Sequence, residues 1–148
     1  DFSTRIFKSG ARCRLFPEAW VWHKRRTDLK KFFKQVHNSG IARINLTKRH
    51  PGTLKLVHLL PAAFTLGLAL LLLAAPLCPW SLLPIGVFAV LIGTDAALRE
   101  RSLKVGLIAI AAALVQLTGY GTGFLRAWWQ RCVQGKGEFE AFRKNFYK

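Results

Sequence analysis

The sequence predicts a mainly α-helical, polytopic membrane protein, and the distribution of charge along the chain is the first reason. Asp, Glu, Lys and Arg do not occur in the 39 residues 56–94 or in the 21 residues 105–125. A helix needs about 20 predominantly apolar residues to cross a hydrocarbon layer roughly 30 Å thick. The first run, broken near Pro76 and Pro79, therefore holds two crossings and the second holds one. The predicted spans lie near residues 56–76, 79–97 and 104–125.

The 23 basic residues collect outside these runs and predict an orientation. Fourteen lie in residues 1–55, three in 99–104 and six in 126–148. Because Lys and Arg next to spans mark the cytoplasmic side, the first two groups are expected there, at the two ends of a hairpin. A third complete crossing, favoured because 21 apolar residues suffice, places the last group outside. A re-entrant turn at GYGTG, residues 119–123, is the alternative that keeps it inside.

The first 23 residues predict a short helix followed by strands. In DFSTRIFKSG the apolar residues share one helical face, and Gly10 is a stop signal. The segment ARCRLFPEAWVWH, residues 11–23, alternates weakly between apolar and polar residues and is rich in aromatic and branched side chains. Two short strands around Pro17 are therefore expected.

An amphipathic helix is predicted for residues 27–46, with Thr27 as its N-cap and a bend at Gly40. Its apolar residues recur at near-helical intervals, namely Leu29, Phe32, Phe33, Val36, Ile41 and Ile44. Lysines largely occupy the other faces. Such a helix, placed just before a membrane hairpin, is suited to the headgroup layer; a core helix of a soluble domain is the alternative.

Three further features of composition narrow the class of protein. Cys13, Cys78 and Cys132 lie far apart and lack metal-ligand spacing, which indicates unpaired thiols. The net charge of +16 alone would fit a nucleic-acid-binding module, but no base-stacking or groove-reading motif accompanies it. Basic clusters beside spans are instead typical of contact with anionic lipids. The chain contains no Met and begins with Asp1 in helix-like sequence, so a fragment is expected.

Three motifs in the first 43 residues resemble a known family. The first comprises Asp1, Ser3, Arg5, Ile6 and Gly10, and the second comprises Pro17, Ala19, Val21 and His23. The third, FFKQVHNSGIAR, has the form Phe-x-x-Gln with a later Gly-x-x-Arg. Together with the apolar runs and YGTGF, these motifs resemble the C-terminal part of a bacterial, membrane-bound family 2 glycosyltransferase.

The resemblance implies an inverting sugar transfer from a nucleotide-sugar donor on a GT-A fold, with a divalent metal, Mg or Mn, in the complete enzyme. In such chemistry a carboxylate deprotonates the acceptor hydroxyl, while metal or cationic groups stabilise the departing diphosphate. The nucleotide-binding strands and the Asp-x-Asp metal motif of the family do not occur in these 148 residues. The piece is therefore expected to be inactive alone.

The resemblance also implies roles for single residues. Asp1 matches the last acidic position of the family's cluster and is a candidate catalytic group, with N-capping as its ordinary role. His23 matches a position that holds metal or diphosphate in some relatives. Arg25 and Arg26 are candidate contacts for the donor diphosphate or for lipid phosphate, although such a pair is more often a solvated charge run.

Gln35 and Arg43 are the candidate acceptor-binding residues. They are eight residues apart, so a continuous helix places them roughly on one side, and they loosely resemble the Gln and Arg of the family's acceptor-side helix. Surface hydrogen bonding is the alternative role. His37, His50 and His58 are expected to have ordinary surface or interfacial roles.

The predicted organisation has four parts. Residues 1–26 end a GT-A domain, 27–50 form the interfacial helix, 51–128 form the membrane region and 129–148 form a basic amphipathic tail. The implied partners are a nucleotide-sugar donor, a lipid-linked or glycan acceptor and anionic lipids, in the bacterial cytoplasmic membrane with the N-terminal region cytoplasmic. A non-enzymatic helical membrane adaptor remains the alternative.

Overall fold

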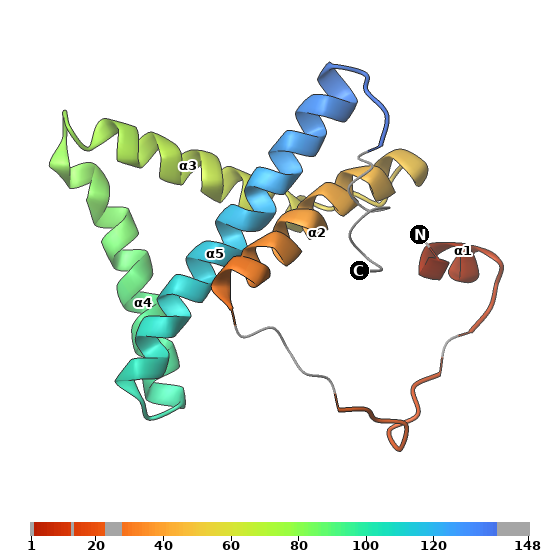
Figure 1. The fold of residues 1–148 in the computed structure, drawn as a ribbon, viewed down its shortest axis with the longest axis horizontal. Helices are drawn as coiled ribbons and strands as arrows, with labels where there is room; N and C mark the ends of the chain where they lie inside the picture. The colour runs from red at the N-terminus through yellow and green to blue at the C-terminus, as the bar shows by residue number, and fades with distance from the viewer. Residues whose placement is uncertain (1, 13, 23–27, 139–148) are drawn as a thin grey trace.

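The computed structural model describes residues 2–12, 14–22 and 28–138, and long helices dominate it (Figure 1). In chain order these are α1 (Phe2–Lys8), α2 (Leu29–Arg49), α3 (Leu60–Ala74), α4 (Leu83–Arg99) and α5 (Leu103–Trp128). Short 3-10 turns precede α3 (η1, Leu56–His58) and α4 (η2, Pro79–Leu82), and a π-helical turn (η3, Trp129–Val133) extends α5.

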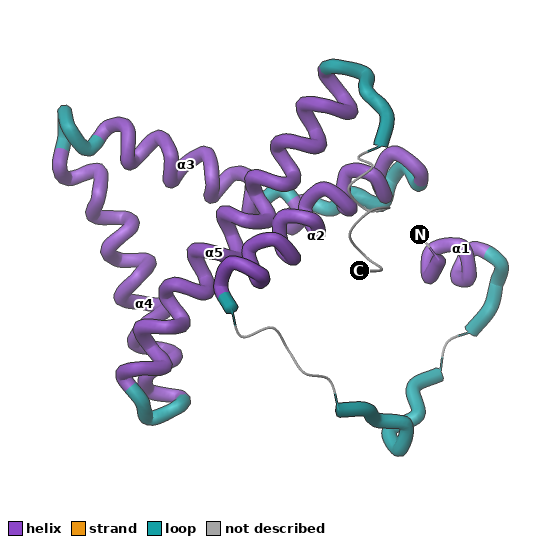
Figure 2. The backbone as a smooth tube through the Cα atoms, viewed as in Figure 1, coloured by secondary structure: helices purple, strands orange, loops and turns teal. Residues whose placement is uncertain are grey.

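The N-terminal segment confirms the predicted helix but not the predicted strands. Gly10, with a φ of +77°, follows α1, as expected of a glycine stop. Residues 14–22 form no strand (Figure 2), and the prediction of two strands around Pro17 is wrong for these residues. A strand needs a neighbour for its backbone groups, and the described part of the chain supplies none. Instead, Ala19 N–H donates to Phe16 O over 3.1 Å and closes a turn. The α/β remnant expected in residues 1–26 is therefore not seen in the described residues.

The predicted amphipathic helix is present as α2, with a correction at its N-terminus. Its N-cap is Asp28, whose Oδ1 accepts hydrogen bonds from Lys30 N at 2.7 Å and Lys31 N at 3.4 Å. Thr27, the predicted cap, lies outside the described residues. The predicted bend at Gly40 does not interrupt the helix, because α2 is helical throughout. Gly40 instead permits close contact with α5, as described below.

Three helical segments are long and apolar enough to span a membrane, as predicted. They are Leu56–Ala74, Pro79–Arg99 and Leu103–Val133, with 19, 21 and 31 residues. The last segment is helical through residues 119–123, so the alternative of a re-entrant turn at GYGTG is wrong. At about 1.5 Å per residue it extends roughly 46 Å, well beyond the hydrocarbon thickness. Its C-terminal part therefore extends out of the lipid when the rest spans it.

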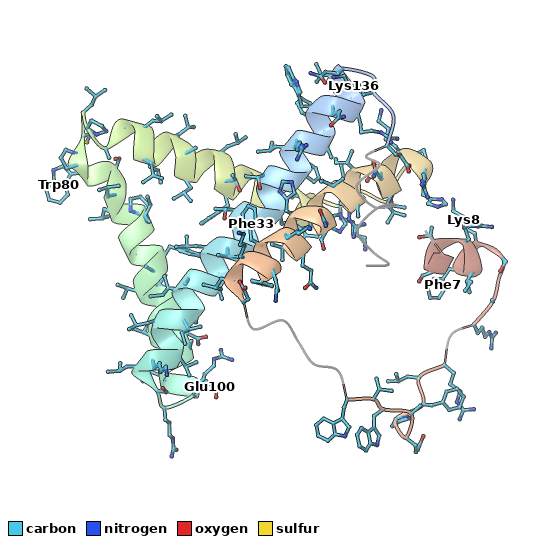
Figure 3. The ribbon with its side chains drawn as sticks, viewed as in Figure 1. Phe7, Lys8, Phe33, Trp80, Glu100 and Lys136 are labelled. Atoms are coloured by element: carbon cyan, nitrogen blue, oxygen red, sulfur yellow. The ribbon has the colours of Figure 1, made fainter. Side chains whose placement is uncertain are left out.

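The helices α3, α4 and α5 form the three sides of a triangle, and α2 lies along the C-terminal half of α5 (Figure 1). Where α2, α3 and α5 meet, five apolar residues are buried: Ile41, Ile44, Ala62, Phe124 and Ala127. Most large apolar side chains of α3 and α4 point outward (Figure 3). Such an extensive apolar surface is typical of a protein in contact with lipid.

Candidate functional site at the contact of α2 with α5

Glycines from both helices hold α2 against α5. Gly119 and Gly123 are four residues apart and therefore share one face of α5. A Cβ atom added to Gly40 of α2 would lie only 2.7 Å from Phe124 N, and one added to Gly123 would meet the backbone of His37. Small residues let helix backbones approach closely in lipid, where no hydrophobic force drives helices together. These glycines therefore fix the separation of the two helices.

The opposite face of α5 packs on α3 in the same way. A Cβ atom on Gly121 would meet the side chain of Thr65 and the carbonyl of Pro61. Thr65 Oγ1 donates to Pro61 O over 2.8 Å and also lies 3.3 Å from Leu117 O. The GYGTG sequence thus seats α2 and α3 on two sides of one helix.

One polar pair lies inside this glycine-lined contact. His37 Nδ1 is 3.1 Å from Thr122 Oγ1. Thr122 Oγ1 also lies 2.7 Å from Thr118 O and 3.0 Å from Gly119 O, so its hydroxyl can donate within α5. When it does so, it accepts from His37 Nδ1–H, and the tautomer of His37 sets the direction of this contact.

The surroundings keep His37 neutral. Burial lowers the pKa of His37 below its usual 6.5, and the positive charge of Arg126 lowers it further, against a smaller opposing effect of the Gly119 carbonyl. The ring of Phe33 stacks on the imidazole with 5.9 Å between the centroids. At a pH below this pKa the protonated ring would be repelled by the positive charge of Arg126. The contact between α2 and α5 is therefore more stable at neutral pH than in acid.

Ionic contacts close the far end of the same interface. Arg49 Nε donates to Glu138 Oε1 over 2.8 Å and Nη2 donates to Oε2, so the pair is bidentate. Arg131 Nη1 lies 3.7 Å from the same carboxylate. Lys8 Nζ is 3.2 Å from His50 Nδ1, which links α1 to the end of α2. Segments from both ends of the described chain thus meet at one place.

The two predicted acceptor-binding residues both lie on α2. Gln35 is exposed, and Arg43 is half-buried near His58, at a distance where their charges interact. Because α2 is uninterrupted, eight residues separate them by about 12 Å along the axis and about 80° around it. They therefore share a broad side of the helix but not a common point.

The other predicted site residues, Asp1, His23, Arg25 and Arg26, lie outside the described residues. Within the described ranges, no three His, Cys, Asp or Glu side chains gather as a possible metal site. The divalent metal implied by the family resemblance stays a prediction. Two of the three cysteines, Cys78 and Cys132, are exposed free thiols, as predicted.

Sequence reasoning missed the residues that build this contact. His37 was assigned an ordinary surface or interfacial role, and the glycines of GYGTG were considered only as a turn. Gly119 and Gly123 form a small-x-x-x-small pattern on an apolar helix, which is the available signal for close helix packing. Nothing in the sequence indicates that the partner is Gly40. Comparisons with family models, curated proteins and solved structures gave no match for this chain.

Proposed function

We propose that the chain is the membrane-anchoring and acceptor-side part of a glycosyltransferase in a bacterial cytoplasmic membrane. The complete enzyme would move a sugar from a nucleotide-sugar donor to a lipid-linked or envelope polysaccharide acceptor. The sequence motifs ending at His23 and Arg43 resemble family 2 glycosyltransferases, and they precede the membrane segments in the order that this function requires.

The position of α2 is the observation that carries the proposal. The glycine contact holds α2 beside the part of α5 that follows residue 119, and Arg126 marks where charge returns after the apolar run. The reducing end of a lipid-linked glycan lies at this same depth, just outside the hydrocarbon. α2 reaches this depth near Ile44, which is buried in one cluster with Ala127, and the neighbouring Arg43 is placed to bind such an acceptor.

In this proposal the residues have separate tasks. Gln35 and Arg43 orient the acceptor, since an amide and a guanidinium can bind sugar hydroxyls and phosphate. His23, Arg25 and Arg26 belong to the donor side, near the diphosphate. A divalent metal bound in the complete enzyme would help to stabilise that diphosphate as it departs.

The test uses the complete protein in native membranes and measures two rates: sugar transfer to a lipid acceptor and hydrolysis of the donor. Gln35→Ala and Arg43→Ala should each lower transfer by roughly tenfold, the size of one lost polar contact, and leave donor hydrolysis largely unchanged. Ser39→Ala is the matched control, because Ser39 lies one turn after Gln35 and its Oγ donates to Gln35 O within α2. His23→Ala should instead lower turnover and alter the dependence on metal.

Equal transfer rates for all four variants and the wild type would show that these residues are structural. A second function, a non-enzymatic membrane adaptor, is favoured by one observation: residues 14–22 are exposed throughout, and α2 to α5 pack together without them. If native membranes containing the complete protein neither bind nor hydrolyse a nucleotide sugar, the glycosyltransferase proposal fails and the adaptor remains.

A further inference from the structure

The two ends of the membrane region lie on the same side of the membrane. α2 precedes the first apolar segment, and its six Lys and Arg residues prevent it from spanning lipid. It packs along α5 from Gly119 onward, and Arg49 pairs with Glu138 beyond the end of α5. Since neighbouring side chains cannot be separated by a bilayer, the chain crosses an even number of times between residues 50 and 126.

Three span-length helices and an even number of crossings are compatible if two of the helices share one crossing. We infer that α5 crosses the membrane completely, whereas α3 and α4 together make one bent crossing. Their connection, residues 75–82, then remains within the hydrocarbon layer, and its binding partner is lipid acyl chains. This inference rests on packing and charge, and it does not depend on the proposed function.

α5 is the complete crossing because charge bounds it at both ends. Lys104 stands at its start and Arg126 follows its apolar run, and 22 residues at about 1.5 Å give roughly 33 Å. That length matches the hydrocarbon thickness. Between these residues α5 has no charged face, so it is unsuited to lying on the membrane surface.

The three corners of the helical triangle differ in charge, and this difference supports the same topology. The corner between α4 and α5 has exposed Arg99, Glu100 and Arg101, and the corner where α3 meets α5 lies beside the middle of the lysine- and arginine-bearing helix α2, at Ile41 and Ile44. These two corners take the two faces of the bilayer. The third corner, between α3 and α4, has no charged residue, and Trp80 projects from it (Figure 3).

The backbone of residues 75–82 is suited to a site without water. Pro76 and Pro79 have no N–H group. The N–H groups of Leu77 and Cys78 donate to Ala74 O at the end of α3, over 3.0 and 2.9 Å, and Ser81 N–H donates to Cys78 O over 3.0 Å. The Ser81 hydroxyl donates to Leu71 O over 2.9 Å. In lipid, backbone groups must be satisfied internally, and this turn satisfies these donors.

Side chains around the same turn favour lipid as the partner. Leu77 and Trp80 are 91% and 78% exposed in the absence of a bilayer. Between α3 and α4 lies a hollow of about 210 Å³ with apolar walls that include Phe64, Leu68 and Phe88. Acyl chains would cover these surfaces, which water would leave unfavourably exposed.

The orientation rule agrees with this topology. With two net crossings, 20 of the 23 basic residues lie on the side of α2, and only the three in residues 99–104 lie opposite. Three complete crossings would move the six basic residues of 126–148 to the other side. The bias of Lys and Arg towards the cytoplasm is therefore satisfied better by the shared crossing.

Thiol labelling of the full-length chain in sealed, oriented vesicles tests the inference. Four variants each retain one cysteine: native Cys78, native Cys132, Lys48→Cys at the exposed end of α2 and Glu100→Cys in the charged turn. A membrane-impermeant maleimide should label Cys132 and Lys48→Cys from one face and Glu100→Cys from the other. Cys78 should react from neither face, and only after detergent is added. Labelling of Cys78 in denaturant confirms that the thiol is free to react.

Each alternative gives a different pattern. Three complete crossings predict that Cys78 and Cys132 react from the face opposite to Lys48→Cys, and either result overturns the inference. A nitroxide on Cys78 provides a second measurement on otherwise native protein. It should be more accessible to oxygen than to a water-soluble nickel complex, and the reverse order would place the turn in water.

Discussion

The contact of α2 with α5 and the pairing of α3 with α4 join helices in opposite ways. The first relies on glycine, and the backbones of Gly40 and Phe124 approach so closely that one methyl group would collide. The second relies on a ring contact, Phe64 with Phe88, at 5.1 Å between centroids, before α3 and α4 diverge. In lipid, apolar side chains gain little by leaving one apolar neighbour for another. Close glycine packing therefore marks the fixed part of the molecule, and the ring contact marks the part that shares its surface with lipid.

The largest expected effect is from adding one methyl group at the glycine contact. Gly40→Ala and Gly123→Ala should each lower the free energy of unfolding by about 1–3 kcal/mol, the usual cost of overpacking. Gly67→Ala in α3 and Gly86→Ala in α4 are matched controls, because a Cβ atom there meets nothing within 4 Å. They should be neutral or stabilising, since Ala favours helix. Unfolding in detergent micelles by titration with SDS measures all four, and equal effects at the four sites would contradict the comparison.

A smaller loss is expected in the α3 and α4 pair. Phe88→Leu removes the ring contact with Phe64 and should cost about 0.5–1.5 kcal/mol. The same titration gives the value, with Leu91→Ala, which is 63% exposed on α4, as the control for simple loss of size. A cost above that of Gly40→Ala would mean that α3 and α4 pack as firmly as α2 and α5.

The third expectation concerns pH and is confined to the glycine contact. The pKa of His37 is lowered by burial and by Arg126, so the unfolded chain, with a pKa near 6.5, binds a proton first as pH falls. Stability is therefore complete above about 6.5 and decreases as pH falls towards the folded pKa. His37→Gln cannot titrate and should show a flatter profile than wild type between about pH 7 and 5. Since the other histidines remain in both proteins, only the difference between the two profiles reports on His37. Parallel profiles would show that His37 does not sense pH.

The smallest effect is expected at the exposed end of the contact. Glu138→Gln weakens the ion pair with Arg49. The side chain of Arg49 is 49% exposed and that of Glu138 is 38% exposed. Such exposed pairs contribute little to stability, and salt should reduce the difference from wild type. Exchanging the charges, with Arg49→Glu and Glu138→Arg together, should restore part of the loss. A salt-independent effect would point to packing rather than charge.

The elements were predictable because each depends on nearby residues. The charge-free runs gave the spans to within three residues at all but the last end, which continues to Val133 as helix. The apolar spacing of residues 29–44 gave α2. The strands around Pro17 failed for the opposite reason, since a strand depends on a partner that the chain must supply from elsewhere. His23, Arg25 and Arg26, which follow them, remain predictions.

The pairing of elements was not predictable from these patterns. Helical periodicity identifies an apolar face of α2, but this face could be covered equally well by lipid or by another helix. Gly40 looked like a bend because glycine weakens an isolated helix, whereas its use here is to admit the backbone of another helix. Gln35 and Arg43 were placed on one helix correctly, and their proposed role in binding an acceptor remains to be tested.

The order of synthesis gives the α2 and α5 contact one more consequence. His37 and Thr122 are 85 residues apart in the chain, and ribosomes add about 5–20 residues per second. For roughly 4–17 seconds, therefore, α2 exists while its partner helix has not yet been made. During that interval its apolar face is not yet covered by α5, and the headgroup layer is suited to bind an amphipathic helix of this kind. Docking of α2 on α5 would then be a late event of biogenesis, and substitutions at Gly40 would act after insertion of the membrane helices rather than before it.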